Sequence, residues 1–374
     1  MGIYNRKYAM KSLLQTAAPL VAALVLAFGI AASAQGRHPA PAPPSGQTAP
    51  SGTAAAKAPG KPGQNAPPVG QLRREVRLVN MVFSVLNSKD HFVTDLKQNN
   101  FEVFDNNIPQ HVEFFNRETN LPLRIGLLMD TSNSIRPRLR FEKSTAFDFL
   151  YHIIRPGKDM AFVMTFDTQP QIQQGFTDNL DLLRHAIDEQ QAGGGTALYD
   201  AIYAAARDYL MNSPPAAGNQ NMRRVLVVIS DGMDDLSGDT RSEAVDMAER
   251  AGVVIYTISS SRDWLSPDQQ TAEGLPLKLH YNAGDRILQA FSDQTGGRAF
   301  FPSQVDDLAK AFADISTELR TQYSIAFTPS NEPNDGKFHH VQIEIVGRNG
   351  LKVRSRQGYW APSLSGAPIA AGRN

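Results

Sequence analysis

Residues 123–134 read LRIGLLMDTSNS, an apolar run that ends in a loop with one carboxylate and three hydroxyl side chains. Further apolar runs follow at residues 160–166, 225–229 and 253–258, and stretches with helical patterning separate them. Such runs between amphipathic helices are typical of a parallel sheet that is covered on both faces. We therefore predict an α/β domain at residues 121–320, built on a doubly wound, mostly parallel sheet. Its predicted helices cover residues 139–154, 180–190, 197–210, 241–251, 286–294 and 305–319.

The edge of this sheet is where functional side chains are expected. A doubly wound sheet binds its ligand beyond the carboxyl ends of its strands. In this chain those ends are predicted at Met129, Phe166, Ile229 and Ile258. In the first helix, Phe141, Phe149 and Ile153 are expected on the buried face, with the charged residues elsewhere.

Five residues near this edge have side chains suited to a metal ion. They are Asp130, Ser132, Ser134, Thr196 and Asp231. Carboxylates and hydroxyls without histidine or cysteine favour a hard, oxygen-seeking divalent ion over zinc or copper. We predict Mg²⁺, or Mn²⁺ in its place, with an open position that suits a carboxylate from another molecule.

At these residues the chain resembles the von Willebrand factor A domain family. The family's metal-ion-dependent adhesion site combines Asp-x-Ser-x-Ser on one loop, a Thr on a second and an Asp on a third, and all five have a match here. The resemblance implies that Ser132, Ser134 and often Thr196 bind the metal directly, whereas the two aspartates bind it directly or through water. Asn133 stands where relatives often have Gly, and a turn tolerates this change well.

Capping and turn chemistry is the alternative interpretation of the same residues. Asp130, ahead of Pro137, would suit a helix N-cap, and Thr196 and Asp231 each fit a turn. We favour the metal site because three separated motifs occur in the right order and in the right strand–helix context. Asp239 or Thr240 with Glu243 is interpreted as a capping box. The other acids nearby are interpreted as structural or solvated groups: Asp200, Asp234 and Asp235.

Several classes of enzyme lack parts that they need. The chain has no Gly-x-Ser-x-Gly elbow with a partnered His, and Gly195 is followed by Thr196-Ala197 where a Walker loop needs Gly-Lys-Ser/Thr. An aspartic protease needs two paired Asp elements, and metal-assisted hydrolysis has no evident general base. His339 and His340 are expected at the surface. We assign no catalytic residue and predict that the protein is not an enzyme.

Composition excludes further classes. Lys plus Arg and Asp plus Glu are 37 each in 374 residues, so no net charge draws the protein to nucleic acid. Cysteine is absent, which excludes disulfide frameworks and thiolate metal sites.

Two β-rich flanks, at residues 71–120 and 321–362, are each too small to bury a sandwich core alone. Residues 76–85 and 101–104 are strand-like, and residues 105–107 form a turn that predicts a hairpin with residues 111–114. At the other end, residues 323–327, 340–346 and 351–354 alternate at period two. We predict that the flanks pair into one small β-sandwich with the middle domain inserted. Residues 100–104 and 357–360 are similar to a bacterial exported subfamily of von Willebrand factor A proteins.

The first 70 residues predict export. Residues 1–34 combine a basic start, an apolar run and Ala32-Ser33-Ala34, which indicates a cleaved signal peptide. An uncleaved membrane anchor is the alternative, and no later run is long enough to span a membrane. Residues 35–70, rich in Pro, Ala and Gly, predict a disordered linker, and residues 363–374 a disordered tail. The expected location is the periplasm or the exterior.

These features predict an exported, adhesion-type protein that captures an acidic side chain of a partner protein through bound Mg²⁺. The partner is a protein that presents Asp or Glu. The alternative is a structural or assembly module of the cell envelope, in which the metal is vestigial or only stabilising and the sandwich and linker make the contacts.

Overall fold

The computed structural model of the protein describes residues 78–118, 120–215, 222–261, 282–302, 305–330 and 334–363. The predicted signal peptide and linker, and the predicted tail apart from Ser363, lie outside these ranges. Within them, no helix combines the length and the apolar character that crossing a membrane requires.

A six-stranded sheet forms the centre of the middle domain, with the strand order β10-β9-β8-β5-β6-β7. Neighbouring strands pair in parallel except β7, which runs antiparallel to β6. The strands are β5 (Leu123–Asp130), β6 (Met160–Phe166), β7 (Pro170–Thr177), β8 (Arg223–Ser230), β9 (Val253–Ser259) and β10 (Ala299–Phe300). The predicted α/β fold with a mostly parallel sheet is confirmed.

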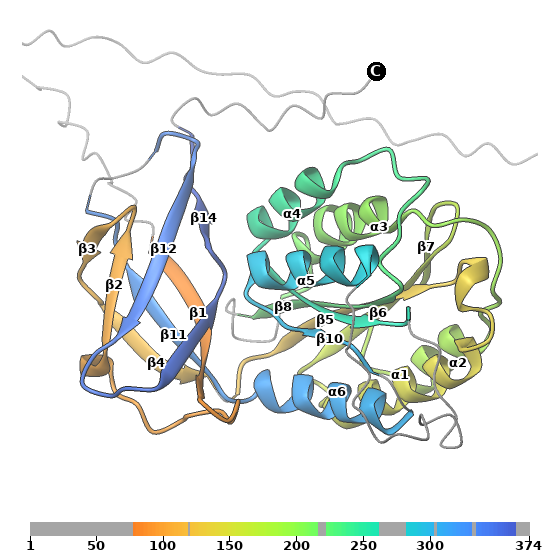
Figure 1. Ribbon diagram of the computed structural model, residues 1–374, viewed down its shortest axis with the longest axis horizontal. Coiled ribbons are helices and arrows are strands. Elements are labelled where there is room, and N and C mark those ends of the chain that lie inside the picture. Colours follow the sequence, from red (N-terminus) through yellow and green to blue (C-terminus); the bar gives the residue numbers. More distant parts are fainter. Residues whose placement is uncertain are drawn as a thin grey trace, which may run out of the picture. The chain divides into compact units, whose positions relative to one another are not determined.

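Helices cover both faces of this sheet (Figure 1). One face carries α1 (Leu139–Ile153), α2 (Leu180–Asp188) and α6 (Val305–Glu318). The other face carries α3 (Leu198–Ala204), which continues as a π-helical turn (Ala205–Leu210), together with α4 (Arg241–Arg250) and α5 (Ala283–Thr295). Short 3-10 turns lie at Gln98–Asn100 and Asn133–Ile135.

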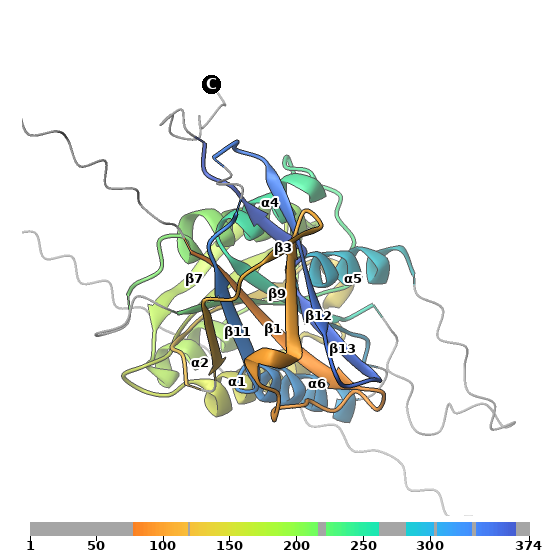
Figure 2. The same cartoon turned by 90° about the vertical axis from the view of Figure 1, so that its left-hand side faces the viewer.

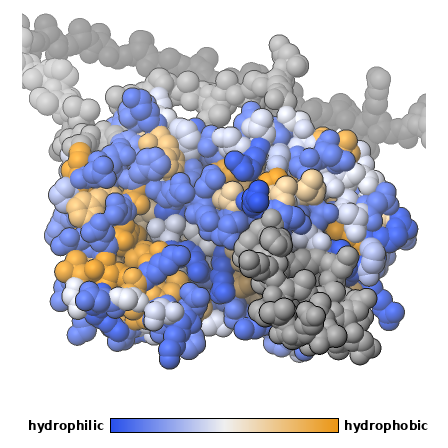
Figure 3. Space-filling view, in the orientation of Figure 1, coloured by the Kyte–Doolittle hydropathy of each residue, from blue (hydrophilic) through white to orange (hydrophobic). Residues whose placement is uncertain are grey.

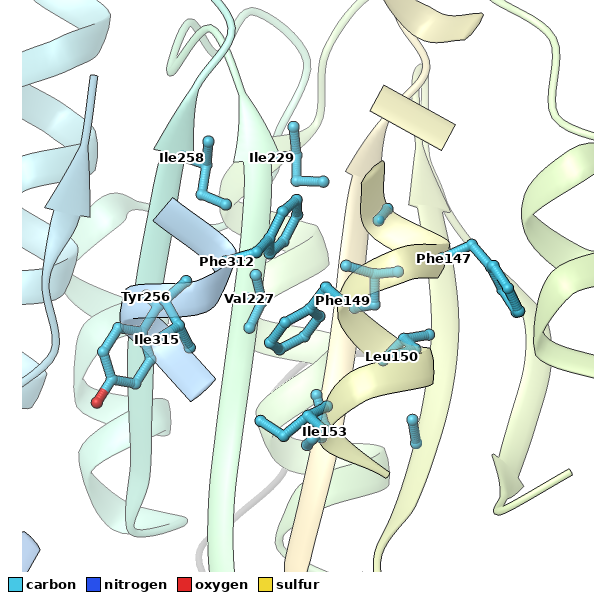
Figure 4. Close-up of a cluster of buried hydrophobic side chains, with 14 of the residues drawn as sticks. Phe147, Phe149, Leu150, Ile153, Val227, Ile229, Tyr256, Ile258, Phe312 and Ile315 are labelled. Atoms are coloured by element: carbon cyan, nitrogen blue, oxygen red, sulfur yellow. The ribbon is translucent and has the colours of Figure 1, made fainter. Parts of the chain in front are cut away.

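Each face of the sheet has its own hydrophobic core. In the core shown in Figure 4, the rings of Phe149 from α1 and Phe312 from α6 stack with their centroids 4.8 Å apart. Val227 and Ile229 of β8 lie beside these rings. β5 is buried along its whole length, as expected for a central strand between two helix layers. The two cores fix the strand ends, and so the loops that follow them.

Both flanks contribute to two antiparallel sheets, ordered β13-β1-β11-β4 and β14-β12-β2-β3 (Figure 2). The strands before the middle domain are β1 (Val79–Asn87), β2 (Phe101–Asp105), β3 (Ile108–Gln110) and β4 (Phe114–Glu118). Those after it are β11 (Gln322–Phe327), β12 (Phe338–Ile345), β13 (Leu351–Ser355) and β14 (Gly358–Trp360). The sheets share one buried core, with Phe83, Tyr323 and Phe101 at its centre.

Three details differ from the sequence predictions. The hairpin after β2 pairs with Ile108–Gln110 rather than residues 111–114, because Asn106 and Asn107 both adopt positive φ and turn the chain at once. His339 is buried rather than at the surface, whereas its neighbour His340 is exposed. On α1, Phe141 is only half-buried and Glu142 faces the interior.

Candidate metal centre

The first loop of the site begins where β5 ends, at Asp130. This carboxylate is fully buried and is held by two hydrogen bonds. Its Oδ1 accepts from the backbone N of Ser132 at 2.8 Å, and its Oδ2 accepts from the Oγ of Ser230 at 2.7 Å. Because Ser230 ends the neighbouring strand β8, the Asp130 carboxylate is fixed by two adjacent strand ends.

The environment of Asp130 disfavours its charge. Burial raises the pKa of Asp130 to about 6, and the negative charge of Asp231 acts in the same direction. The hydrogen bonds from Ser132 and Ser230 oppose this rise. A cation bound nearby would remove the penalty, since it favours the ionised carboxylate.

Ser132 and Ser134 form a hydroxyl pair on the same loop. Their Oγ atoms lie 2.9 Å apart, with Ser132 buried and Ser134 exposed. Asp130 does not cap α1, which has Arg138 at its N-cap position and no side-chain cap there. Its hydrogen bond from the N of Ser132, two residues on, is nevertheless the turn contact that the alternative interpretation expects. The loop thus presents two hydroxyls beside a buried carboxylate, open to solvent on one side.

The glycine-rich second loop packs against the first. The N of Gly193 donates to the O of Thr131 at 2.7 Å, and the side chain of Asn133 donates to the O of Gly194 at 3.2 Å. Gly194 has φ 74°, and a Cβ there would lie 2.8 Å from the Oγ1 of Thr168, so glycine is required. Thr196, which follows, is buried.

The third loop carries Asp231 and braces the second loop. Asp231 is half-buried, and its Oδ1 accepts from the N of Met233 at 3.0 Å. The carboxylate of Asp235 accepts from the N of Thr196 at 2.7 Å, and that of Asp234 accepts from the N of Leu198 at 3.1 Å. Asp234 and Asp235 thus connect the two loops.

Two other acidic groups in this region also have structural contacts. The carboxylate of Asp200 accepts from the backbone N atoms of Gly238 and Asp239. Thr240 and Glu243 form a capping box at the start of α4. Both observations agree with the structural interpretation of these acids.

The five predicted ligands therefore lie on three neighbouring loops at the carboxyl edge of the sheet. Asp130, Ser132 and Ser134 lie on one turn, Asp231 interacts electrostatically with Asp130, and Thr196 is tied to the third loop by its backbone. Among the described residues, no three histidine or acidic side chains are grouped so that they could hold a metal by themselves. Hydroxyls would have to supply part of the ligand set, and such a hard oxygen set fits Mg²⁺ or Mn²⁺.

Sequence reasoning missed two residues here, Ser230 and Glu142. Ser230 orients Asp130, and its hydroxyl also accepts from the N of Gly232 at 3.0 Å. Burial raises the pKa of Glu142 to about 8, and the charges of Asp130 and Asp231 act in the same direction. The spacing of Glu142 from Leu139, Ala146 and Phe149 would have placed it on the buried face of α1.

The amino-acid sequence of this part of the chain also matches a known family, in agreement with the order of the loops and with the parallel sheet covered on both faces. Residues 125–233 match the family model described as the von Willebrand factor type A domain. The match begins in β5 and ends just after Asp231, so it includes all five candidate ligands. No curated protein sequence matches the chain.

Several solved structures are similar to this chain. One is proximal thread matrix protein 1 from the mussel byssus, with a zinc-occupied MIDAS (metal-ion-dependent adhesion site) motif. It is 16% identical over 57% of this chain and 49% of that one (TM-score 0.42). BatB from Bacteroides thetaiotaomicron is 16% identical over 52% of this chain and 99% of that one (TM-score 0.38). A von Willebrand factor type A structure from Catenulispora acidiphila is 11% identical over 72% and 76%, respectively (TM-score 0.42). The chain spans about half the length of the mussel protein.

Proposed function

We propose that this chain is an exported, non-enzymatic binding protein whose von Willebrand factor type A domain holds Mg²⁺ or Mn²⁺ and captures an Asp or Glu of a partner protein. The observation that carries the proposal is the Ser132–Ser134 hydroxyl pair, 2.9 Å apart, beside the buried Asp130. When bound, the ion would supply an electrophilic centre for a carboxylate oxygen. Export rests on residues 1–34 alone.

The five candidate ligands would contribute two kinds of oxygen to the metal. Ser132, Ser134 and Thr196 would supply neutral oxygens, while Asp130 and Asp231 would supply negative charge. Ser230 holds Asp130 in one orientation, and Asp235 holds the backbone of Thr196. Because Ser134 is exposed, a side chain of another protein can approach from its side of the loop.

Calorimetric titration of the full chain with Mg²⁺ and Mn²⁺ tests the site. We expect saturable binding that is lost in Asp130→Ala, because the central carboxylate is removed. Asp95→Ala is the matched control, since Asp95 is an exposed acid of the sandwich that pairs with Arg348, and it should bind metal as the wild type does. Zn²⁺ belongs in the same titrations, given the zinc-occupied mussel neighbour. Equal binding by wild type and Asp130→Ala would contradict the proposal.

The second candidate function is an assembly module of the cell envelope whose contacts lie on the sandwich. It is favoured by the exposed hydrophobic side chains Leu78, Ile108, Phe114 and Val346. In Figure 3, hydrophobic residues gather over the part of the surface that the sandwich occupies in Figure 1. Under this function, EDTA would lower the melting temperature without changing partner capture, and Phe114→Ser would reduce capture. Under the metal-dependent function, EDTA would abolish capture.

A further inference from the structure

Glu142 is a buried acid for which the described part of the chain provides no hydrogen-bond partner. It lies in the first turn of α1, seven residues beyond the 3-10 turn Asn133–Ile135 that closes the first site loop, and only 1% of it is exposed. Neither carboxylate oxygen has a hydrogen-bond partner among the residues that the structure describes. Because a buried carboxylate without a partner costs several kcal/mol, this arrangement calls for an explanation.

Another buried glutamate shows how this chain can satisfy such a group. Glu318 of α6 is fully buried, and it accepts from the Oγ of Ser84 at 3.0 Å and from Arg354 at 3.1 Å. The fold can therefore place a hydroxyl and an arginine beside a buried glutamate. At Glu142 it places neither within hydrogen-bond distance.

The charges that reach Glu142 connect it to the metal centre. Both Asp130 and Asp231, on two different loops of the site, act on the Glu142 carboxylate electrostatically. Arg138 opposes them, from the start of the same helix. Three carboxylates, from β5, the loop after β8 and α1, thus act on one another electrostatically. A bound cation would offset this mutual repulsion.

We infer that Glu142 is a further acidic residue of the metal centre, acting from α1 through ordered water on a divalent cation held by the five loop residues. Because no three histidine or acidic side chains among those described are grouped to hold a metal by themselves, we place Glu142 behind the loop ligands, with water between it and the ion. A carboxylate behind the direct ligands orients bound water and strengthens metal affinity. This inference rests on the proposed function and names a positioning residue that the five-residue motif leaves out.

Calorimetric Mg²⁺ titration of the full chain tests this role with Glu142→Gln, which keeps the shape of the side chain and removes its charge. We expect roughly 10- to 100-fold weaker Mg²⁺ binding, the usual effect of removing a residue behind the direct ligands. Without metal the urea midpoint should change little at neutral pH, since a pKa of about 8 leaves most of the Glu142 side chain uncharged there. Glu249→Gln is the matched control, because Glu249 is also a buried helical acid with a raised pKa but lies in α4. It should leave Mg²⁺ affinity unchanged.

A second variant keeps the test decisive if Glu142→Gln does not fold. Glu142→Met fills similar volume without polar atoms and is expected to fold and to lose the same Mg²⁺ affinity. If wild type binds Mg²⁺, Asp130→Ala does not, and both Glu142 variants bind as wild type does, this inference alone is wrong. If wild type does not bind Mg²⁺, the proposed metal site is wrong and the inference falls with it.

Discussion

Buried carboxylates in this protein differ in whether hydrogen bonds and nearby positive charges outweigh the effect of burial on the pKa. Burial works against the charge of Asp159, but hydrogen bonds from Arg155 and Arg320 more than compensate, so the pKa of Asp159 is lowered. Glu142 and Glu249 have raised pKa values instead. Ionisation of Asp159 therefore stabilises the fold, whereas ionisation of Glu142 or Glu249 destabilises it.

Glu249 gives a pH dependence with a definite sign. Burial, followed by the charge of Asp246, raises the pKa of Glu249 from 4.5 to about 7. Between these values the folded protein retains a proton that the unfolded chain has released, so this residue makes the free energy of unfolding fall as the pH rises. Glu249→Gln cannot ionise, and we expect its unfolding free energy to decline less steeply. Urea unfolding of both proteins across this pH range checks it, and equal slopes would refute the assignment.

At the level of single residues, the sequence predicted the site residues whose side-chain type by itself indicates metal binding. Asp130, Ser132 and Ser134 could be identified because carboxylate and hydroxyl groups follow an apolar strand directly. Glu142 was missed because a charged residue in an amphipathic helix is ordinarily assigned to the solvent face. Its role depends on which side of α1 meets the sheet, and that is a property of packing rather than of residue type.

The C-terminal end of α6 is tied to the sandwich by a buried ion pair. Glu318, the last residue of this helix, is bound by Arg354 of β13 and by Ser84 of β1. Both partners belong to sandwich strands, so the helix end is fixed to two of them. The end of α6 and the first sandwich sheet should therefore lose their structure together.

Arg354→Met tests this link. The substitution removes the guanidinium of Arg354 and leaves Glu318 buried without its charged partner. We expect the free energy of unfolding to fall by about 3–5 kcal/mol. Arg348→Met is the matched control, because the Arg348–Asp95 pair is exposed, and it should cost about 0–1 kcal/mol. Urea denaturation of the two variants measures both values. Similar losses of unfolding free energy in the two variants would show that the buried pair stabilises the fold no more than the exposed pair does.

Helices and the long strands were predictable because each shows a hydrophobic period or a continuous apolar run. The unpredicted strands β7, β10 and β14 have a common cause. β10 and β14 have two and three residues, too few to show an alternation. β7, QIQQGF between Pro170 and Thr177, is a polar edge strand of the sheet. Such strands are fixed by their neighbours, which a local pattern does not reveal.

The sandwich is a property of the whole chain, since neither flank has a complete sheet. In the first sheet, β1 lies between β13 and β11, and in the second, β2 pairs with β12. The small size of each flank was enough to predict that they pair. Sequence pattern could not supply the order of the strands, because it depends on contacts between residues that are distant along the chain.

Deleting residues 321–362 tests this dependence. The deletion removes both neighbours of β1 and one neighbour of β2, so we expect residues 78–118 to unfold and to be cleaved early in limited proteolysis. The middle domain keeps all six strands of its own sheet and should resist for longer. Mass spectrometry of the fragments from the full and the shortened chain measures this. Protection of residues 78–118 in the shortened chain would contradict it.

The pairing of β4 with β11 also has a consequence for the order in which the protein folds. Glu118, where the chain leaves the sandwich, is paired with Gln322, where it returns. A chain emerging from synthesis completes β1 to β4 long before their partners exist, and closing so long a loop carries an entropic cost. If the middle domain folds first, it brings these two ends together and shortens the loop to be closed. Folding of the inserted domain would then hold strands β1 to β4 close to strands β11 to β14, with which they pair.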